Sequence, residues 1–349
     1  MRAYFTKKIL QFKQPAGTSR GVLTEKPSWF LILYNEQDHQ KRAIGECSVI
    51  PGLSPDQEER IEGRLSEICE TINQGEESDV IFRGLPAVQF AWEMARIDYK
   101  RGGKRMLFPS DFTSGHQGIP INGLIWMGEA EEMRWQVQKK ITQGFGCIKL
   151  KIGAIGIEKE LNLLHDIRKE YPSAQLELRV DANGAFRYPE AREIMDRLAE
   201  LEVHSIEQPV PVNHHEEMSR LCSERPLPVA LDEELIGYYG YENKYRLVEK
   251  IRPQYLILKP SLLGGFKEAE EWIDVARQLN IGWWVTSALE SNVGLNALAQ
   301  WAYSLGVKTP QGLGTGALFR EDIVSPLEIR DAQLYYNNNR HWDESFLQS

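Results

Sequence analysis

Short apolar runs recur through the last two thirds of the chain, and several of them are followed by a charged residue. Asp181 follows Leu-Glu-Leu-Arg-Val, Glu207 follows His-Ser-Ile, Asp232 follows Val-Ala-Leu and Lys259 follows Leu-Ile-Leu. The successive spacings are 26, 25 and 27 residues. Each spacing has the length of one strand, one helix and their connections, so the pattern predicts repeated βα units.

Eight such runs, with amphipathic stretches between them, lie beyond about residue 121. This number of strands and helices predicts a (β/α)8 barrel, for which about 250 residues is typical. An open doubly wound sheet is the competing architecture, but no Gly-x-Gly-x-x-Gly follows a strand, so a dinucleotide site has no support. The expected strands are 123–126, 148–151, 176–180, 204–207, 229–232, 255–259, 283–286 and 312–314, and expected helices include 157–170, 189–201, 266–279 and 292–304.

The first hundred residues have a different pattern. Apolar and polar residues alternate there as in an antiparallel meander, and two helical patterns follow. Strands followed by helices predict an α+β domain. The expected strands are 2–15, 19–35 and 42–49, and the expected helices are 56–74 and 86–101.

The stretch 114–123 is rich in Gly and Pro and marks a boundary between these two regions. We therefore expect an α+β domain over residues 1–115 and a barrel over residues 116–325. The last segment, 326–349, has less repeat character and contains a strand-like stretch at 333–336. We expect this segment to pack on the N-terminal domain.

The composition narrows the functional classes. A net charge of −9 argues against nucleic acid as a partner, because phosphate binding requires a basic surface, but it leaves room for a small anionic substrate. The four cysteines show no metal-type pairing and are expected to be buried thiols. No apolar stretch has the length of a signal peptide core or a membrane span. We expect a cytoplasmic protein, with a homo-oligomer left open.

Residues at the carboxyl ends of barrel strands converge on one site, so Asp181, Glu207, Asp232 and Lys259 should meet there. Three carboxylates in a low-dielectric pocket repel one another unless a cation neutralises them. A hard ion such as Mg²⁺, with Mn²⁺ as the alternative, suits an all-carboxylate site. Zinc is disfavoured, because no histidine stands at a corresponding strand end.

Lys149 and Lys151 stand one βα unit before Asp181 and share one face of their strand, because strand side chains alternate. A lysine near a divalent cation and another lysine loses its proton more easily, which suits a general base. The cation would stabilise the enediolate formed when the proton α to a carboxylate leaves. The pattern therefore predicts proton abstraction next to a carboxylate.

Each residue taken alone has a structural explanation. Asp181 begins the turn sequence Asp-Ala-Asn-Gly, Glu207 precedes Gln-Pro and could end a strand, and Lys259 precedes a proline. The occurrence of all of them in phase with the repeat favours the functional interpretation.

These residues lie in five motifs: Lys149-Leu150-Lys151, Asp181-Ala182-Asn183, Glu207-Gln208-Pro209, Asp232-Glu233 and Leu258-Lys259-Pro260. The set resembles the enolase superfamily, in particular its muconate-lactonizing-enzyme subgroup, over nearly the whole chain. The resemblance implies an α+β capping domain over a modified (β/α)7β barrel. It implies metal ligation by the three carboxylates, with Lys151 as acid and base on one face of the substrate and Lys259 on the other. A Lys or His base acting with Mg²⁺ is the superfamily's known mechanism and is not deduced from these residues.

Three further motifs are similar to the o-succinylbenzoate synthase family of that subgroup: GECSVIPGLS (45–54), SALESNVG (287–294) and QGLGT (311–315). The resemblance implies dehydration of a cyclohexadiene carboxylate that bears a succinyl group and a hydroxyl, in menaquinone biosynthesis. Lys151 would remove the α-proton and assist the loss of water, and Lys259 would stabilise the enediolate as a cation. Candidates for substrate contact, or for support of the metal ligands, are Lys149, Arg179, Asn183, Ser287 and Gly312.

Two alternatives remain open. An N-succinylamino acid racemase would use both lysines as opposed bases, and a dipeptide epimerase is disfavoured because no carboxylate stands at 312–317 to bind a substrate ammonium. A non-catalytic binding protein would not need three carboxylates and two lysines together. In any of the enzymes, we expect the loops at 18–20 and 50–54 to close over the barrel mouth, given their Gly and Pro content and their place in the capping domain.

Overall fold

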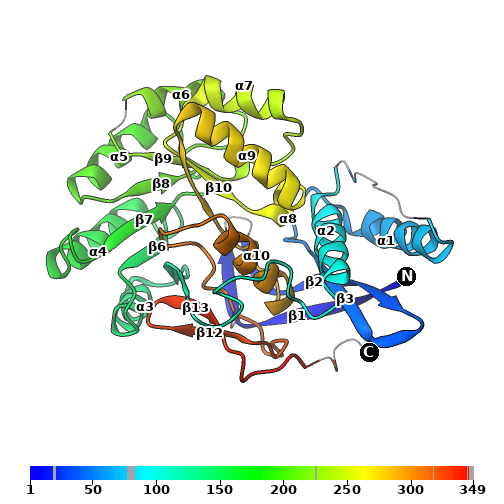
Figure 1. The fold of residues 1–349 in the computed structure, drawn as a ribbon. Coiled ribbons are helices and arrows are strands. Elements are labelled where there is room, and N and C mark those ends of the chain that lie inside the picture. The colour runs from blue at the N-terminus through cyan, green and yellow to red at the C-terminus, as the bar shows by residue number, and fades with distance from the viewer. Residues whose placement is uncertain are drawn as a thin grey trace.

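The computed structural model describes residues 1–18, 21–76, 82, 84–224, 226–316, 318–343 and 345. One part of the molecule is an antiparallel sheet covered by two helices, and the other part is a curved parallel sheet surrounded by helices (Figure 1). The chain runs through the first part before it enters the second, in the order expected from the sequence.

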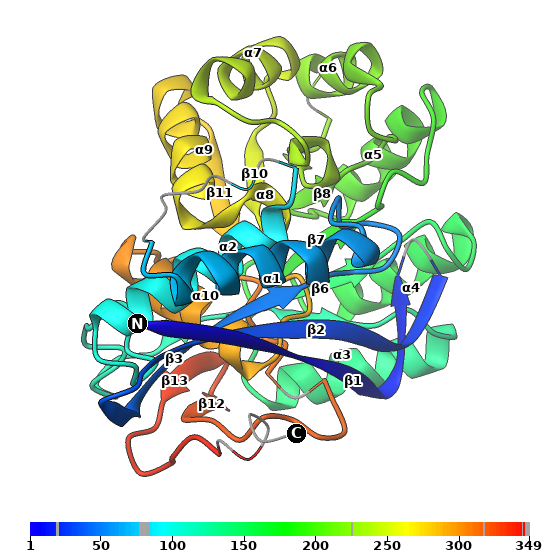
Figure 2. The ribbon, with the colours of Figure 1, turned by 90° about the vertical axis from the view of Figure 1, so that its right-hand side faces the viewer.

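The N-terminal sheet has the order β1-β2-β3, formed by β1 (Arg2–Thr18), β2 (Gly21–Asn35) and β3 (Asp38–Ser48). The helices α1 (Glu58–Asn73) and α2 (Pro86–Lys100) pack against it (Figure 2). Pro86 stands at the first turn of α2, where its missing N–H costs nothing. The order of three strands and two helices matches the expected α+β domain.

Strand β2 explains how this domain joins the rest of the molecule. Its run Trp29–Phe30–Leu31–Ile32–Leu33 is fully buried, as expected of a strand covered on both faces. Trp29, Leu31 and Leu33 belong to a core shared with α1 and α2, whereas Phe30 and Ile32 belong to the main core that extends through the barrel. The alternation of side chains along one strand therefore fixes the N-terminal domain to the barrel.

The parallel sheet has the order β5-β6-β7-β8-β9-β10-β11. Two isolated parallel bridges, Thr286 to Gly312 and Ile121 to Gln311, place the 311–312 segment between the first and last strands of this sheet. This segment stands in the position of an eighth strand, and the fold is the expected (β/α)7β barrel with an N-terminal capping domain. The strands are β5 (Gly123–Ile125), β6 (Cys147–Lys151), β7 (Glu177–Asp181), β8 (Ser205–Glu207), β9 (Val229–Leu231), β10 (Tyr255–Leu258) and β11 (Gly282–Val285).

Helices follow the barrel strands and surround the sheet, with α4 to α7 and α9 on its outside in Figure 1. A short helix, α8, begins at Pro260, directly after Lys259, and η1 (Glu233–Leu235) begins directly after Asp232. Both expected strands therefore end one residue earlier than the sequence suggested. The helices are α3 (Ala130–Thr142), α4 (Ile157–Glu170), α5 (Glu190–Glu200), α6 (His215–Glu224), α7 (Tyr241–Ile251), α8 (Pro260–Leu263), α9 (Gly265–Leu279) and α10 (Asn292–Ser304).

The C-terminal segment forms a hairpin of β12 (Leu327–Arg330) and β13 (Gln333–Tyr336), and β13 pairs with β4 (Ile119–Pro120). The Tyr336 ring contacts the Phe112 ring at a centroid distance of 6.2 Å, and the Trp342 ring lies 5.1 Å from the Arg105 guanidinium. The segment thus contacts the chain on both sides of residue 115, where the domain boundary was expected.

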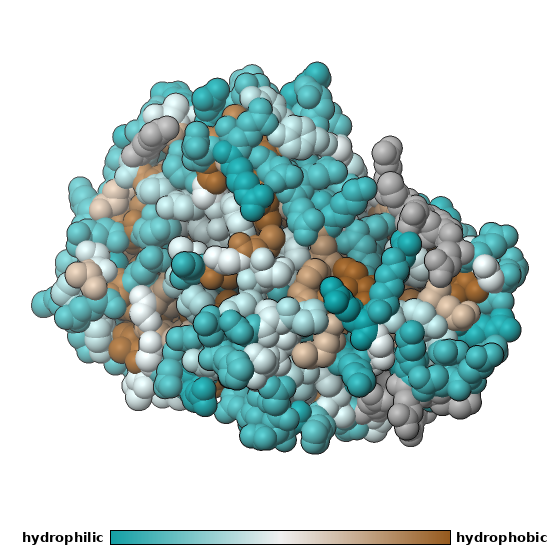
Figure 3. Space-filling model, in the orientation of Figure 1, coloured by the Kyte–Doolittle hydropathy of each residue, from teal (hydrophilic) through white to brown (hydrophobic). Residues whose placement is uncertain are grey.

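The face of the molecule seen in Figure 3 is mostly hydrophilic, with apolar residues in small separate patches. Among the described residues, no helix has the length and apolar character needed to cross a membrane.

Candidate active site

Three buried carboxylates stand at the carboxyl ends of neighbouring strands. Asp181 is the last residue of β7 and pairs in register with Glu207, the last residue of β8, while Asp232 directly follows β9. All three are at most 3% exposed. Lys151, at the end of β6, is the register partner of Asp181 on its other side. The parallel register therefore brings together residues that the sequence separates by one βα unit each.

Two lysines lie among these carboxylates. The Lys149 ammonium is 2.9 Å from Asp181 Oδ2 and 2.6 Å from Glu207 Oε2, and the Lys259 ammonium donates to Asp232 Oδ2. Burial alone would lower the pKa of each lysine, but the surrounding carboxylates outweigh it and raise the pKa of both above the ordinary value. Both lysines are therefore held as cations in this arrangement.

The carboxylates respond unequally to the same surroundings. Burial raises the pKa of Asp181, but Lys149 and Lys151 outweigh burial and hold it well below its usual range. Burial and the neighbouring Asp181 raise the pKa of Glu207 to about 8. Burial likewise raises the pKa of Asp232, although Lys259 opposes it. Adjacent acids with divergent pKa values in one pocket are typical of a functional site.

The donor set has the chemistry of a divalent-cation site, because it offers carboxylate oxygens alone. Glu207 Oε1 is buried and has no hydrogen-bond partner among the described residues, so one ligand oxygen is available. Across the same described residues, no three acidic, histidine or cysteine side chains converge closely enough to form a ready ligand cluster. The ammonium of Lys149 lies between two of the carboxylates instead. A cation would therefore have to draw the three side chains closer together.

Lys151 is held by a different set of contacts. Its ammonium donates to Asn183 Oδ1 at 2.7 Å and lies 4.0 Å from Asp181 Oδ2. Asn183, which adopts a left-handed conformation at φ 44°, donates in turn to Glu233 Oε1 at 2.9 Å. The other oxygen, Glu233 Oε2, is buried and without a hydrogen-bond partner in the described part of the chain. The amide of Asn183 thus links Lys151 to Glu233.

A cavity of about 100 Å³ opens beside these groups and is lined by Lys149, Lys151, Asp181, Asn183, Glu233 and Lys259. Ser287 and Gly312 line it as well, and Ser287 N donates to the Gly312 carbonyl at 3.0 Å. The Ser287 hydroxyl is 2.7 Å from the Thr315 hydroxyl. Seven of the ten expected site residues thus line this cavity. Glu207 and Asp232 do not line it, but they contact the lining residues Lys149 and Lys259.

The capping domain reaches the same cavity. Ile50 and Leu53, from the loop that follows β3, form part of its wall. This is the position expected for the 50–54 loop. The other loop expected at the barrel mouth includes Ser19 and Arg20, which lie outside the described residues.

Arg179 is the exception among the residues expected to contact the substrate or to support the metal ligands. It shares the strand face of Asp181, but its guanidinium binds Glu177 Oε1 at 2.7 Å and the Pro310 carbonyl at 3.0 Å, and lies 4.3 Å from the Trp284 ring. It is not among the residues that line the cavity. The Arg179 side chain is therefore part of the buried interior of the barrel and does not reach the cavity proposed for the substrate.

Sequence reasoning missed part of the cavity wall. The alternation of β5 could have indicated Leu124 and Trp126, which share one strand face. Thr286 shares the face of Trp284 at the end of β11 and could have been found in the same way. Asn122 also lines the cavity and belongs to none of the motifs identified in the sequence. Four more lining residues lie in the motifs 287–294 and 311–315 but were not named as site residues: Ala288, Leu289, Gly314 and Thr315.

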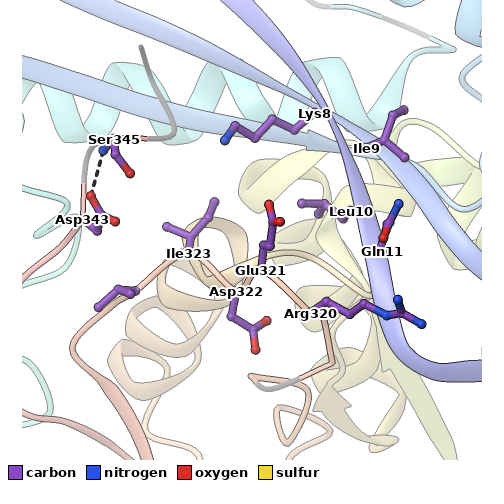
Figure 4. Close-up of a pocket in the computed structure, with 11 residues that line it drawn as sticks. Lys8, Ile9, Leu10, Gln11, Arg320, Glu321, Asp322, Ile323, Asp343 and Ser345 are labelled. Carbon is purple, nitrogen blue, oxygen red and sulfur yellow. Dashed lines mark hydrogen bonds between the residues drawn. The ribbon is translucent and has the colours of Figure 1, made fainter. Parts of the chain in front are cut away.

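A second hollow, with a volume of about 290 Å³, lies between β1 and the segment 320–324 (Figure 4). Lys8, Arg320, Glu321, Asp322 and Asp343 contribute charges of both signs to its lining. It contains none of the strand-end carboxylates or lysines, so the smaller cavity in the barrel remains the candidate active site.

Comparison with known proteins places the barrel in a family. Residues 132–338 match the family described as enolase C-terminal domain-like. The chain is 45% identical to an o-succinylbenzoate synthase of Desulfotalea psychrophila, over 94% of this chain and 97% of that protein. The crystal structure of MenC from the same organism superposes with a TM-score of 0.87 at 42% identity and covers 96% of this chain and 99% of the other.

A more distant relative bears on the alternative function. An N-succinylamino acid racemase of Thermus thermophilus is 30% identical, over 72% of this chain and 66% of that enzyme. The match to the synthase is both stronger and more complete, and includes the capping domain.

Proposed function

The chain belongs to the enolase superfamily and, within it, to the o-succinylbenzoate synthase family; from that premise we propose how its residues divide the work of a dehydration. The enzyme is a hydro-lyase that acts on a small-molecule substrate, a cyclohexadiene carboxylate bearing a succinyl group and a hydroxyl. The observation that carries the assignment of roles is that two lysines with different surroundings, Lys151 and Lys259, line one cavity.

Lys151 is the proposed base. In its neutral form it takes the proton α to the carboxylate, the carbon–oxygen bond to the hydroxyl breaks, and the new ammonium returns that proton so that water leaves. Loss of water makes the ring aromatic, which favours the second half of the reaction. Asn183 orients Lys151 through the 2.7 Å contact. Lys259, whose pKa is raised by Asp232 and other carboxylates against the effect of burial, stays charged and stabilises developing negative charge.

Members of this superfamily depend on a divalent metal, and we propose Mg²⁺, with Mn²⁺ as the alternative. Asp181, Glu207 and Asp232 would hold it, and the unpartnered Glu207 Oε1 supports this assignment. Bound there, the cation would supply charge neutralisation beside the carboxylate that becomes an enediolate. Lys149, which contacts two of the three ligands, balances their charge.

The polar rim of the cavity is proposed to bind the rest of the substrate. Ser287 and Thr315 contribute hydroxyl groups, and Gly312 leaves space beside them, on the side formed by β11 and the eighth-strand position. The apolar wall of Leu124 and Trp126 suits the ring. A role in menaquinone biosynthesis and a cytoplasmic location complete the proposal, and nucleic acid and membranes are not expected partners.

The deciding experiment measures aromatic product from the succinyl-bearing diene, and solvent-deuterium exchange into both enantiomers of an N-succinylamino acid, with the same enzyme and with Mg²⁺. We expect efficient product formation that stops after exhaustive chelation and returns with Mg²⁺. Efficient exchange of both enantiomers with negligible aromatic product would instead establish the racemase.

A further inference from the structure

A buried polar network outside the metal and lysine site joins the capping domain to the barrel. On the capping side its members are Lys26, Ser28, Glu46 and Ser48, each with no exposed surface. Lys26 Nζ donates to the hydroxyls of Ser28 at 3.0 Å and Ser48 at 2.6 Å, and the Ser28 hydroxyl donates to Glu46 Oε1 at 3.0 Å. We call these residues, together with Ser261, Glu290 and Ser291 of the barrel, the interdomain network.

Glu46 carries the network across the domain boundary. Its Oε1 accepts from Ser291 N at 2.9 Å, and its Oε2 accepts from the Ser291 hydroxyl at 2.6 Å and from Gly294 N at 2.9 Å. Ser291 is the N-cap of α10. The first N–H groups of a helix lack partners within the helix and attract negative charge. A carboxylate from β3 therefore satisfies the start of a barrel helix more than 240 residues away in the sequence.

The residues before α10 form part of the cavity wall. Ala288 and Leu289 line the cavity, and Leu289 has a left-handed φ of 59°, which a leucine rarely adopts. Glu290 Oε2 accepts from Ala288 N at 2.6 Å and closes this turn. Glu290 Oε1 accepts from the hydroxyl of Ser261. Ser261 stands two residues after Lys259, so the same network also reaches the start of α8 beside the second active-site lysine.

The charges in the network depend on one another. Two carboxylates and one ammonium are buried together, and burial lowers the pKa of Lys26 and raises that of Glu290. Each oxygen of Glu46 already accepts two hydrogen bonds. An amide at this position would keep one acceptor oxygen and turn an N–H donor toward the donors of Ser291 and Gly294.

We propose that Glu46 is a positioning residue for the dehydration, a role that rests on the function proposed above. It fixes the start of α10 and thereby holds the 287–290 turn, with its strained Leu289, in the shape that receives the substrate. The capping domain would then shape the cavity in two ways: directly through the 50–54 loop, and from behind through Glu46.

The chain offers a matched control. Glu93, on α2, accepts from Phe266 N at 2.6 Å and Lys267 N at 3.3 Å, so it too is a capping-domain carboxylate on the first turn of a barrel helix, α9. Neither Glu93 nor its partners line the cavity. Loss of either carboxylate should weaken the joint between domains in a similar way, but only Glu46 should act on substrate binding.

The test compares Glu46→Gln, Glu93→Gln and the milder Ser291→Ala in the full-length, Mg²⁺-loaded enzyme, below the melting temperature of each. We expect Glu46→Gln to lower kcat/KM for the diene by roughly tenfold or more, because the substitution removes a hydrogen bond to a charged carboxylate. Most of this change should appear as a higher KM, because the 287–290 turn that receives the substrate is displaced. Ser291→Ala should show a smaller change in the same direction, and it replaces Glu46→Gln if that variant does not fold. Glu93→Gln should keep the wild-type KM and kcat.

Two results would overturn the proposal in different ways. In the first, the wild type is active, and Glu46→Gln and Ser291→Ala have the same KM as Glu93→Gln. The interdomain network would then only hold the two domains together, and the positioning role would be refuted. A wild type that forms no aromatic product would refute the proposed function on which the role depends.

Discussion

Lys151 and Lys259 face one cavity with different partners, and this difference predicts their separate tolerance of substitution. Lys151 contacts the neutral amide of Asn183, whereas Lys259 pairs with the carboxylate of Asp232. Arginine keeps the charge but does not deprotonate in proteins. We therefore expect Lys151→Arg to abolish dehydration, a loss of at least about a thousandfold in kcat, and Lys259→Arg to retain measurable activity. Product formation in both variants measures this, and an active Lys151→Arg would exclude Lys151 as the base.

Residue types at the site could be predicted from sequence, but their partners could not. The phase of Asp181, Glu207 and Asp232 with the repeat was enough to bring them to neighbouring strand ends. Strand alternation predicts which face of β7 Arg179 occupies. It does not predict that the long Arg179 side chain contacts Glu177 and Trp284 instead of pointing to the cavity. Side-chain direction along a barrel axis depends on tertiary contacts, which a single sequence does not reveal.

At the scale of elements, α4 supports the loop that follows Lys151. The buried Glu160 accepts from the backbone N–H groups of Gly153, Ala154 and Ile155 at 2.7, 2.9 and 3.0 Å. In Glu160→Gln an amide donor replaces one of these acceptors, and we expect a loss of about 1 to 3 kcal/mol in unfolding free energy together with a several-fold drop in kcat. Denaturant unfolding and turnover measure both.

Glu158, two residues earlier in the same first turn of α4, supplies the control for that variant. It pairs with Arg197 on the surface, where an ion pair contributes little. Glu158→Gln should therefore leave turnover and stability close to wild type. Equal effects of the two substitutions would show that the loop does not depend on the Glu160 carboxylate.

The start of α2 gives a pH-dependent prediction. Asp56 is buried, and its pKa is raised to about 7 by that burial, although it accepts from Ala87 N and Val88 N. An acid whose folded pKa lies above its unfolded value destabilises the fold as pH rises between the two values. From about pH 5 to about pH 8, the unfolding free energy of Asp56→Asn should therefore gain about 3 kcal/mol relative to wild type. Urea unfolding at both pH values measures this, and a constant difference would contradict it.

Elements were predicted better than the joints between them. The strands 255–259 and 148–151 and the helices 157–170 and 292–304 agree with the structure to within one or two residues, because apolar periodicity is local information. The eighth strand, expected at 312–314, is reduced to single bridges at Gln311 and Gly312. A Cβ on Gly312 would come within 2.5 Å of Thr286 Oγ1, so the close approach of the Thr286 side chain to the backbone at position 312 requires a glycine. Such an approach depends on how the barrel closes, not on local pattern.

For the whole molecule, the division into a capping domain and a barrel means that the active site belongs to both. Ile50 and Leu53 come from one part and the lysines and carboxylates from the other. The alternating burial of β2 fixes the two parts together, since Phe30 and Ile32 reach the barrel core. Cross-domain contacts such as that of Glu46 with Ser291 have no signature in the sequence, because their partners are separated by 245 residues.

The last prediction concerns the energetic link between the metal and the folded chain. The three carboxylates meet only when β7, β8 and the end of β9 are in register, so the unfolded chain offers no comparable site and a bound ion must stabilise the fold. At a hundredfold excess of Mg²⁺ over its Kd, the gain is about 2.7 kcal/mol, or several degrees in Tm. Glu207→Gln should lose most of this response, while Glu93→Gln should keep it. Thermal unfolding in MgCl₂ against NaCl of equal ionic strength measures the effect, and a wild-type Tm that does not distinguish the two salts would argue against the proposed ligands.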